Sequence, residues 1–383
     1  MTRGSQDMSN CITHPTLGEF RVVRMIGDGA CATVSLGFNK ELKFMVAFKV
    51  FHNHPDSLKT YEREVELLQS INHPFINNYF DAFEYNGRKI IMLEFIDGLT
   101  LLEKVNTWGV LDENQARVVF IELIQALKYL HKEKKIVHRD IKCENIMIDS
   151  HGNIKLIDFG FAHSNNSSLQ TSCGSLAYIA PEIIIGNGYT EKVDIWSAGI
   201  VLYAITCGHL PFDTTNSNKL LNIILNDEPE YPAHMSINLS DLLSRILKKD
   251  PSERITLEEI EHHPWFTMDS QNRPIHCNYD LLEKLKFKKG RRSGSEKNDI
   301  LQKISEAGNA SQALNALPLY LFPIIHKPLS SISVPRQSSY QKCDPKSLFY
   351  TKLGFAKPTS ERKVVYMKKN LIMKPAKIVP SKW

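Results

Sequence analysis

The sequence predicts an α+β fold with two lobes, a small β-rich lobe followed by a larger α-helical lobe. Three observations lead to this prediction. Residues 20–95 read mainly as strands, and residues 112–266 read mainly as helices. The composition, with 42% hydrophobic and 23% charged residues, is that of an ordinary globular protein with enough apolar side chains for a large core. We expect the two lobes to join near residues 94–99.

The β-rich lobe is predicted from apolar runs that are separated by turn residues. The runs are rich in β-branched and aromatic residues, and they are FRVVRMIG (20–27), ATVSLGF (32–38), MVAFKVF (45–51) and the start and end of FDAFEYNGRKIIMLEF (80–95). The last run contains Asn86-Gly87, a strong hairpin signal. One helical stretch, LKTYEREVELLQSI (58–71), interrupts the strands.

The helical lobe is predicted from two long apolar patterns. Residues 113–132 carry apolar side chains at positions 116, 120, 123, 127 and 130, which form the stripe of a packed amphipathic helix. The run VDIWSAGIVLYAITCG (193–208) is too short to span a bilayer and begins next to an Asp, so we expect a buried core helix.

The charge is unevenly distributed and divides the chain. Residues 1–270 carry 25 Lys and Arg against 35 Asp and Glu, whereas residues 271–383 carry 22 against 7. The second part also lacks sustained periodicity, an internal repeat or the pattern of a second core. We therefore predict an N-terminal extension over residues 1–19, a folded domain over 20–266 and a basic, largely disordered tail over 267–383.

The cysteines and the N-terminal residues indicate the compartment. The seven cysteines are an odd number and form no CxxC pair, which argues against a disulfide framework and against a zinc site. The stretch MTRGSQDMSN lacks the apolar segment of a signal peptide. We therefore expect an intracellular protein, cytoplasmic or nuclear.

Charged and polar side chains concentrate in HRDIKCEN (138–145), between the apolar runs IV and IMI. Burying an unpaired charge costs several kcal/mol or more, so these groups are either paired or used in chemistry. Other chemistry-bearing motifs stand around this stretch in a definite order. They are IGDGACATV (26–34), Lys49 in VAFKV, Glu64 in YEREVELL, DFG (158–160) and APE (180–182).

Together with HRD and Asn145, these motifs are the signature set of protein kinases, in the order that those enzymes have. The chain therefore resembles a eukaryotic-type protein kinase over residues 20–266, about two-thirds of its length. The resemblance implies the bilobal protein kinase fold, with a small β-rich N-lobe and a larger α-helical C-lobe. It also implies ATP and Mg²⁺ as cofactors and proteins as substrates.

The resemblance places ATP between the lobes. A glycine-rich turn lets the backbone approach the phosphates without a Cβ in the way. Leu93 is the expected gatekeeper, and Glu94–Ile96 is the hinge whose backbone reads the adenine edge. The full set of expected ATP-binding residues is Ile26, Gly27, Asp28, Gly29, Ala30, Cys31, Ala32, Val34, Ala47, Lys49, Leu93, Glu94, Ile96 and Met147.

The expected catalytic residues supply charge and positioning, which is what phosphoryl transfer needs. Lys49 would contact the α- and β-phosphates and be anchored by Glu64, while helical phase places Glu62 and Glu66 on other faces. Asp140 would accept the proton of the attacking hydroxyl or orient it.

Three further residues complete the expected reaction centre. Asn145 and Asp158 would hold Mg²⁺ through oxygen atoms. Lys142 would stand near the γ-phosphate, and its spacing from Asp140 favours a Ser/Thr kinase over a tyrosine kinase.

The resemblance assigns structural roles to several other residues. Leu68, His138 and Phe159 would stack in the regulatory spine. Glu182 would pair with Arg254 and brace the lower lobe. Asp194 would tie the catalytic loop to the core helix.

The stretch LQTSCGSLAYIAPE (169–182) most resembles the calcium/calmodulin-dependent and AMP-activated branch of the Ser/Thr kinases. In that branch Thr171 would be the activating phosphosite, modified by an upstream kinase and held by Arg139. Ser175 would line the acceptor pocket, and Glu144 would favour substrates with an upstream Arg.

The sequence departs from this pattern at three places. Ala32 replaces the third glycine of the loop, and Thr100 replaces a Glu that relatives with basic substrates often carry. No proline follows the Ser of CGSLAY.

Other interpretations stay open on the sequence alone. A pseudokinase scaffold is disfavoured because the Lys, Glu, Asp, Asn and Asp of the reaction centre are all present. The basic tail could be merely solvated, contact nucleic acid or an anionic membrane, act as an autoinhibitory arm or bind calmodulin. No nucleic-acid-binding motif supports the interpretation that the tail contacts nucleic acid. The substrate, the upstream kinase and the oligomeric state are not indicated.

Overall fold

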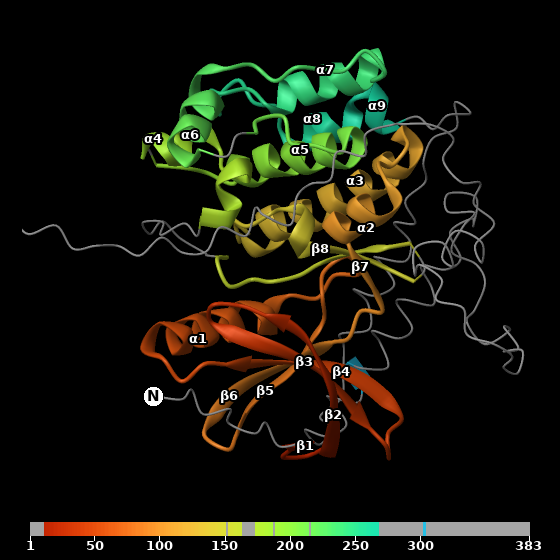
Figure 1. Cartoon of the computed structure of the whole chain (residues 1–383), viewed down its shortest axis with the longest axis vertical. Helices are drawn as coiled ribbons and strands as arrows, with labels where there is room; N and C mark the ends of the chain where they lie inside the picture. Colours follow the sequence, from red (N-terminus) through yellow and green to blue (C-terminus); the bar gives the residue numbers. More distant parts are fainter. Residues whose placement is uncertain are drawn as a thin grey trace, which may run out of the picture.

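The computed structural model describes residues 11–150, 152–162, 173–186, 188–213, 216–267 and 302–303. These residues form a curled β-sheet lobe and a larger helical lobe. In Figure 1 the β-sheet lobe lies below the helical lobe. The predicted α+β, two-lobed architecture is therefore confirmed.

The small lobe is built on a six-stranded antiparallel sheet with the order β1-β2-β3-β4-β6-β5. Its strands are β1 (Cys11–His14), β2 (Gly18–Asp28), β3 (Ala32–Asn39), β4 (Phe44–Phe51), β5 (Tyr79–Tyr85) and β6 (Arg88–Glu94). The β5–β6 turn has Asn86 at φ 51° and Gly87 at φ 71°, which is the left-handed geometry that the Asn-Gly signal predicts.

The first strand closes the sheet on itself. β1 pairs with β2, and His14 Nε2 lies 2.9 Å from Asp81 Oδ2 on β5, at the other edge. The Nδ1 atom of His14 accepts hydrogen bonds from the backbone N–H groups of Thr16 and Leu17. β1 falls within the residues predicted as an extension, so the sheet begins before residue 20. The predicted domain boundary at residue 20 stays a prediction.

Helix α1 (Pro55–Ser70) packs on the sheet and carries one of the key carboxylates. Pro55 stands in its first turn, and the His54 side chain accepts a hydrogen bond from the Asp56 N–H. The helix was predicted over 58–71, and the Pro and the His54 cap explain the earlier start. Its buried side is formed by Ser57, Glu64, Leu67 and Leu68.

The large lobe is built around two helices that the apolar patterns predicted. Its helices are α2 (Leu101–Trp108), α3 (Glu113–Lys128), α4 (Pro181–Ile185), α5 (Lys192–Cys207), α6 (Ser217–Asn226), α7 (Ile237–Ile246), α8 (Leu257–His262) and α9 (Pro264–Thr267). The stripe predicted from Ala116 to Leu130 is at most 1% exposed at each of its positions. From Val193 to Thr206, α5 is buried on all sides, which confirms the core helix.

Short irregular elements and a second sheet complete the described part of the fold. α3 continues into a π-helical segment η1 (Tyr129–Lys134), and 3₁₀ turns form η2 (Cys143–Asn145) and η3 (Cys173–Tyr178). A second sheet has the order β7-β8-β9, with β7 (Gly98–Thr100), β8 (Ile146–Asp149) and β9 (Ile154–Leu156). Residues 95–97 join β6 to β7, as the predicted connection near 94–99 requires.

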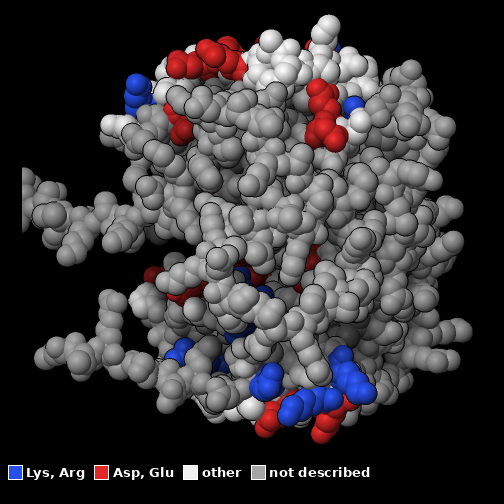
Figure 2. All heavy atoms as spheres, turned by 45° about the vertical axis from the view of Figure 1, so that its right-hand side comes forward, with Lys and Arg blue, Asp and Glu red and all other residues white. Residues whose placement is uncertain are grey.

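Charged side chains are unevenly spread on the face drawn in Figure 2. Among the described residues, Asp and Glu gather at the end formed by the helical lobe, and Lys and Arg gather at the end formed by the β-rich lobe, with some acidic groups among them. Across the described ranges, no helix combines the length and the apolar character that crossing a membrane requires.

A buried carboxyl group in α3 makes the stability of the fold depend on pH. Glu122 is 3% exposed, and its Oε2 accepts a hydrogen bond from the Ile154 N–H at 2.8 Å. Burial raises the pKa of Glu122 from 4.5 to about 8. The folded chain therefore holds a proton that the unfolded chain releases above its own lower pKa. The stability that this group contributes is complete below the pKa of Glu122 in the unfolded chain. It is lost as the pH rises through the pKa of Glu122 in the folded chain.

We expect Glu122→Gln to stabilise the protein relative to wild type by an amount that grows between about pH 5 and about pH 8. The amide keeps the acceptor oxygen but cannot ionise, and one unit of pKa shift corresponds to about 1.4 kcal/mol. Urea unfolding of both proteins at several pH values measures the difference. Glu253→Gln, the same change at an exposed position, is the matched control. A difference that stays constant with pH would contradict the prediction.

Candidate functional site

Two carboxylates from opposite lobes meet at one ammonium group. Lys49 lies in β4, and its Nζ donates to both oxygens of Glu64 at 2.6 and 2.7 Å. The same Nζ donates to Asp158 Oδ1 at 2.9 Å. Glu64 is 1% exposed, whereas Glu62 and Glu66 are exposed, as helical phase predicts. The predicted pair of Lys49 and Glu64 is therefore present, and it extends to the carboxylate of DFG.

Lys49 and Asp158 favour each other's charged forms, whereas burial raises the pKa of Glu64. Burial alone would lower the pKa of Lys49, but the carboxylates of Glu64 and Asp158 raise it above its usual value. Lys49 in turn lowers the pKa of Asp158 to about 2. The ammonium and the Asp158 carboxylate thus stay charged over the whole pH range in which an enzyme would be assayed.

Two polar side chains of HRDIKCEN, those of Lys142 and Asn145, contact the carboxylate of Asp140. Lys142 Nζ donates to Asp140 Oδ2 at 2.7 Å. Asn145 Nδ2 donates to the same oxygen at 2.7 Å and to the Asp140 carbonyl at 2.9 Å. Asp140 is 5% exposed, so its charge is balanced within the loop.

A buried aspartate of α5 holds this loop in place. Asp194 is 0% exposed. Its carboxylate accepts hydrogen bonds from the backbone N–H groups of His138 and Arg139, each at 2.8 Å. The Nε2 of His131 lies 2.8 Å from Asp194 Oδ2. The predicted tie between Asp194 and the loop is confirmed. Arg139 has φ 69°, a left-handed conformation that costs energy for a residue with a Cβ and that these two hydrogen bonds support.

The expected spine residues lie in the core between the lobes. His138 and Phe159 form an edge-to-face ring pair with centroids 4.8 Å apart. Phe159 and Leu68 are 1% and 3% exposed. Burial lowers the pKa of His138, so a neutral ring packs against Phe159. Asp158, beside this phenyl ring, has φ 63°, so packing and the Lys49 contact hold it in a strained conformation.

The glycine-rich turn is a tight hairpin between β2 and β3. The Gly29 N–H donates to the Ala32 carbonyl at 3.0 Å, and a Cβ on Gly29 would lie 3.3 Å from that oxygen. His52 Nε2 lies 3.1 Å from the Gly29 carbonyl and steadies the tip of the turn. Asp28, Gly29 and Ala30 are exposed, whereas Ile26, Gly27 and Cys31 are half-buried and Ala32 is buried.

The expected adenine residues come from both lobes. Ala47 on β4 pairs with Leu93 on β6, and Val34 on β3 lies opposite Lys49. Met147 lies on β8 and pairs with Thr100 on β7. Ile96 is 8% exposed, in the connection to β7. The side chain of Glu94 is held by Asn78 and Lys155, and its backbone N–H donates to the Asn78 carbonyl at 2.9 Å.

Asp158 and Asn145 fit the requirements of a magnesium ion. The amide nitrogen of Asn145 is used by Asp140, so the amide oxygen is the atom left for a metal. A carboxylate oxygen and an amide oxygen are hard donors, and Mg²⁺ is usually bound by one or two such side chains together with substrate phosphates. The structure thus brings together groups of the right chemistry, and their role as ligands stays a prediction.

The expected regulatory and substrate residues are only partly described. Thr171 and the side chain of Ser175 lie outside the described residues. The guanidinium of Arg139 lies 5.0 Å from the ring centroid of Tyr189. Glu144 is half-buried, its Oε2 is buried without a hydrogen-bond partner among the described groups, and burial raises its pKa. A cationic substrate side chain would supply that partner.

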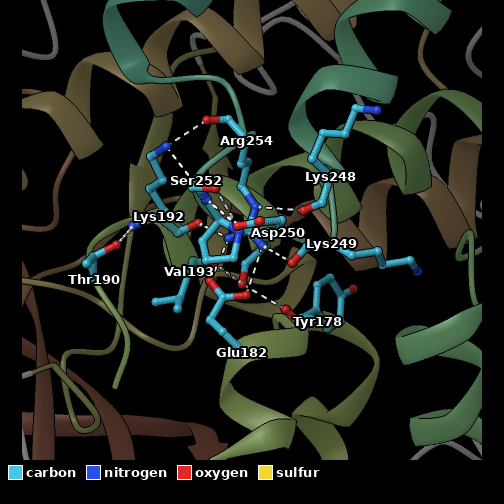
Figure 3. Close-up of polar contacts among 12 residues, drawn as sticks. Tyr178, Glu182, Thr190, Lys192, Val193, Lys248, Lys249, Asp250, Ser252 and Arg254 are labelled. Carbon is cyan, nitrogen blue, oxygen red and sulfur yellow. Dashed lines mark hydrogen bonds and ion pairs between the residues drawn. The ribbon is translucent and has the colours of Figure 1, made fainter. Parts of the chain in front are cut away.

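The predicted pair of Glu182 and Arg254 is confirmed and braces the large lobe (Figure 3). Arg254 Nη1 and Nη2 donate to the two Glu182 oxygens at 2.7 and 2.9 Å. The guanidinium also donates to the carbonyls of Lys192 and Lys248. Lys192 Nζ donates to the Arg254 carbonyl at 2.8 Å. This network connects α4 to the segment before α8.

Comparison with known proteins agrees with this geometry. The protein kinase domain profile matches residues 20–266. The chain is 34% identical to the probable serine/threonine-protein kinase MARK-A of Dictyostelium discoideum over 70% of this chain and 26% of that protein. It is 36% identical to the SNF1-related protein kinase catalytic subunit alpha KIN12 of Arabidopsis thaliana over 65% of this chain and 52% of that protein.

A third relative is matched over more of its own length. The chain is 38% identical to the testis-specific serine/threonine-protein kinase 1 of Mus musculus over 63% of this chain and 70% of that protein. In contrast, the chain spans about a quarter of MARK-A and about half of KIN12.

Proposed function

The chain belongs to the protein kinase domain family, and on this basis we propose that it is a serine/threonine protein kinase. It transfers the γ-phosphate of ATP to Ser or Thr hydroxyls of protein substrates. The observation that carries the proposal is the contact of Lys49 with both Glu64 and Asp158. This contact brings the N-lobe cation, the α1 carboxylate and the expected metal ligand to one point.

The residues of the site divide the work of phosphoryl transfer. Lys49 neutralises the α- and β-phosphates, and Glu64 keeps its ammonium in place. Asp158 and Asn145 would hold Mg²⁺, which would supply positive charge beside the phosphate oxygens. Asp140 orients the attacking hydroxyl and receives its proton. Lys142, which contacts Asp140 Oδ2, places a further cation near the transferred group.

The same geometry disfavours a scaffold that binds partners without transferring phosphate. A scaffold needs none of the strained backbone at Arg139 and Asp158, which the surrounding packing must support. It also has no use for a loop in which Lys142 and Asn145 both contact the carboxylate of Asp140. An intracellular location and protein substrates form part of the proposal.

The proposal is tested by incubating the purified chain with γ-labelled ATP, Mg²⁺ and a Ser/Thr peptide library. We expect labelled peptides with the wild type and none with Asp140→Asn. The control is Asp227→Asn, the same change at an exposed position. Wild-type protein that binds ATP with Mg²⁺ but labels no peptide or protein would overturn the proposal in favour of a scaffold.

We further propose that phosphorylation of Thr171 by an upstream kinase activates the enzyme. The support is Arg139, a cation beside the catalytic loop whose Nε is buried without a hydrogen-bond partner among the described groups. We expect Thr171→Ala to lower kcat by about tenfold or more, because a phosphate can order a segment through arginine. Ser172→Ala is the neighbouring control and should have a smaller effect. Fully active protein in which mass spectrometry finds unmodified Thr171 would contradict this.

A further inference from the structure

Lys155 is a buried cation that the reaction scheme above does not use. It lies in β9, and its side chain is 1% exposed. Its Nζ donates to Glu94 Oε2 at 2.8 Å. A buried ammonium is tolerated when it is paired and hydrogen-bonded. The pair joins a strand of the large lobe to the last residue of β6, where the hinge begins.

A third residue completes this group, which we call the hinge cluster (Asn78, Glu94 and Lys155). Asn78 Nδ2 donates to Glu94 Oε2 at 2.7 Å, so one carboxylate oxygen is shared by Asn78 and Lys155. The backbones of Asn78 and Glu94 are also bonded, because the Glu94 N–H donates to the Asn78 carbonyl at 2.9 Å. The Glu94 carboxylate thus connects the segment before β5 and the hinge to β9.

Backbone hydrogen bonds bring the same segments together beside the cluster. The Leu156 N–H donates to the Phe75 carbonyl at 2.8 Å, and the Asn77 N–H donates to the Leu156 carbonyl at 3.0 Å. The segment from 75 to 78 is therefore fixed along β9. A displacement of the hinge relative to β9 would have to break the Lys155–Glu94 bond, in which the two side chains are 1% and 14% exposed.

The position of the cluster connects the two ends of the nucleotide site. The backbone of Glu94 is part of the hinge that is expected to bind the adenine edge, and its side chain is part of the hinge cluster. Lys155 stands three residues before Asp158, the expected ligand of the metal on the phosphates. One ATP molecule can contact both ends at once only while the hinge and β9 keep a separation that matches the length of the nucleotide.

We propose that Lys155 and Asn78 are positioning residues for ATP, which hold the hinge and β9 at the separation that one nucleotide requires. The inference rests on the proposed function, because it takes ATP as the ligand. Without the cluster, the hinge samples several positions, and the apparent dissociation constant rises in proportion as the competent fraction falls. The cluster touches no reacting atom, so transfer from bound ATP is expected to change little.

The test compares Lys155→Met, Asn78→Ala and the double variant Lys155→Met/Glu94→Gln with the wild type. Lys155→Met leaves the partly buried Glu94 carboxylate without its cation and is expected to lower thermal stability. The double variant removes both charges, so its stability should recover, but the tie between β9 and the hinge stays broken. Lys128→Met, which breaks an ion pair with Glu261 on the large lobe, is the matched control.

Titration with ATP and Mg²⁺ measures binding directly, and peptide phosphorylation gives KM and kcat. We expect the Kd and KM for ATP to rise by about three- to tenfold in the double variant and in Asn78→Ala, and we expect kcat of Asn78→Ala to stay within about twofold of wild type. The KM for peptide should not change. Because Lys155→Met alone is expected to lose stability, the conclusion is drawn from the double variant and Asn78→Ala.

Two outcomes would overturn the inference. One is a Kd for ATP within about twofold of wild type in both the double variant and Asn78→Ala. The other is a Kd that returns to the wild-type value whenever thermal stability returns, which would make the cluster a purely stabilising contact. A wild-type protein that binds ATP but transfers no phosphate would defeat the proposed function alone, since the binding titration would still report on the cluster.

Discussion

Asp158→Asn is expected to reduce phosphate transfer by on the order of 10³-fold or more. The substitution keeps the shape of the side chain but removes the negative charge that a metal ion needs. It also leaves Lys49 with one carboxylate in place of two, because Asp158 Oδ1 accepts a hydrogen bond from Lys49 Nζ at 2.9 Å. Lys49 lowers the pKa of Asp158 to about 2, so a change of assay pH cannot mimic this variant.

Single-turnover measurements at saturating ATP separate this loss of chemistry from weaker binding. The fold should persist, since Asp158 is placed by the packing of Phe159 and does not form the core itself. Thermal unfolding of Asp158→Asn and of the exposed control Asp227→Asn checks that both remain folded. Transfer by folded Asp158→Asn at a rate within about tenfold of wild type would contradict the assigned role.

Arg254→Met is expected to destabilise the protein by about 3–5 kcal/mol. Arg254 is 1% exposed, and its removal leaves Glu182, which is 4% exposed, without its ion-pair partner. An uncompensated buried carboxylate is costly, and a loss of this size is a large part of the about 5–15 kcal/mol that holds a typical protein folded. The network in Figure 3 also loses the guanidinium bonds to the carbonyls of Lys192 and Lys248.

Urea unfolding measures this loss, with Arg245→Met as the control. Arg245 forms an ion pair with Asp241 on α7 in which its side chain is 57% exposed, and exposed pairs contribute about 0–1 kcal/mol. Arg254→Lys keeps the charge but loses the bidentate geometry, so its effect should be intermediate. Equal stabilities of Arg254→Met and Arg245→Met would mean that the Glu182–Arg254 pair does not brace the lobe.

The parts of the fold that could be predicted are those with a strong local signal. Asn86-Gly87 indicated the β5–β6 turn because few other pairs of residue types readily adopt two consecutive left-handed conformations. The stripe from Ala116 to Leu130 indicated α3 because its spacing matches the helical period. The partners Lys49–Glu64 and Glu182–Arg254 are far apart in sequence, and the motif resemblance, not spacing, predicted them.

Other features had no signal that a single sequence could carry. β1 is four residues long, and its pairing with β2 and the His14–Asp81 contact depend on how the sheet curls. The π-helical segment at Tyr129–Lys134 has the same apolar pattern as a continued α-helix. Lys155 was missed because a lysine in a strand usually extends to solvent. Its burial follows from the approach of Glu94, which is remote in sequence.

The central claim is that this site moves phosphate from ATP to an alcohol. The most direct test uses peptides that are identical except for Ser, Thr, Tyr or Ala at one position, with intact mass as the readout after incubation with ATP and Mg²⁺. We expect a gain of one phosphate on the Ser or Thr peptide, none on the Tyr or Ala peptides, and no gain with Asp158→Asn. Unchanged masses of all four peptides and of the chain itself, with ATP shown to be bound, would contradict the account.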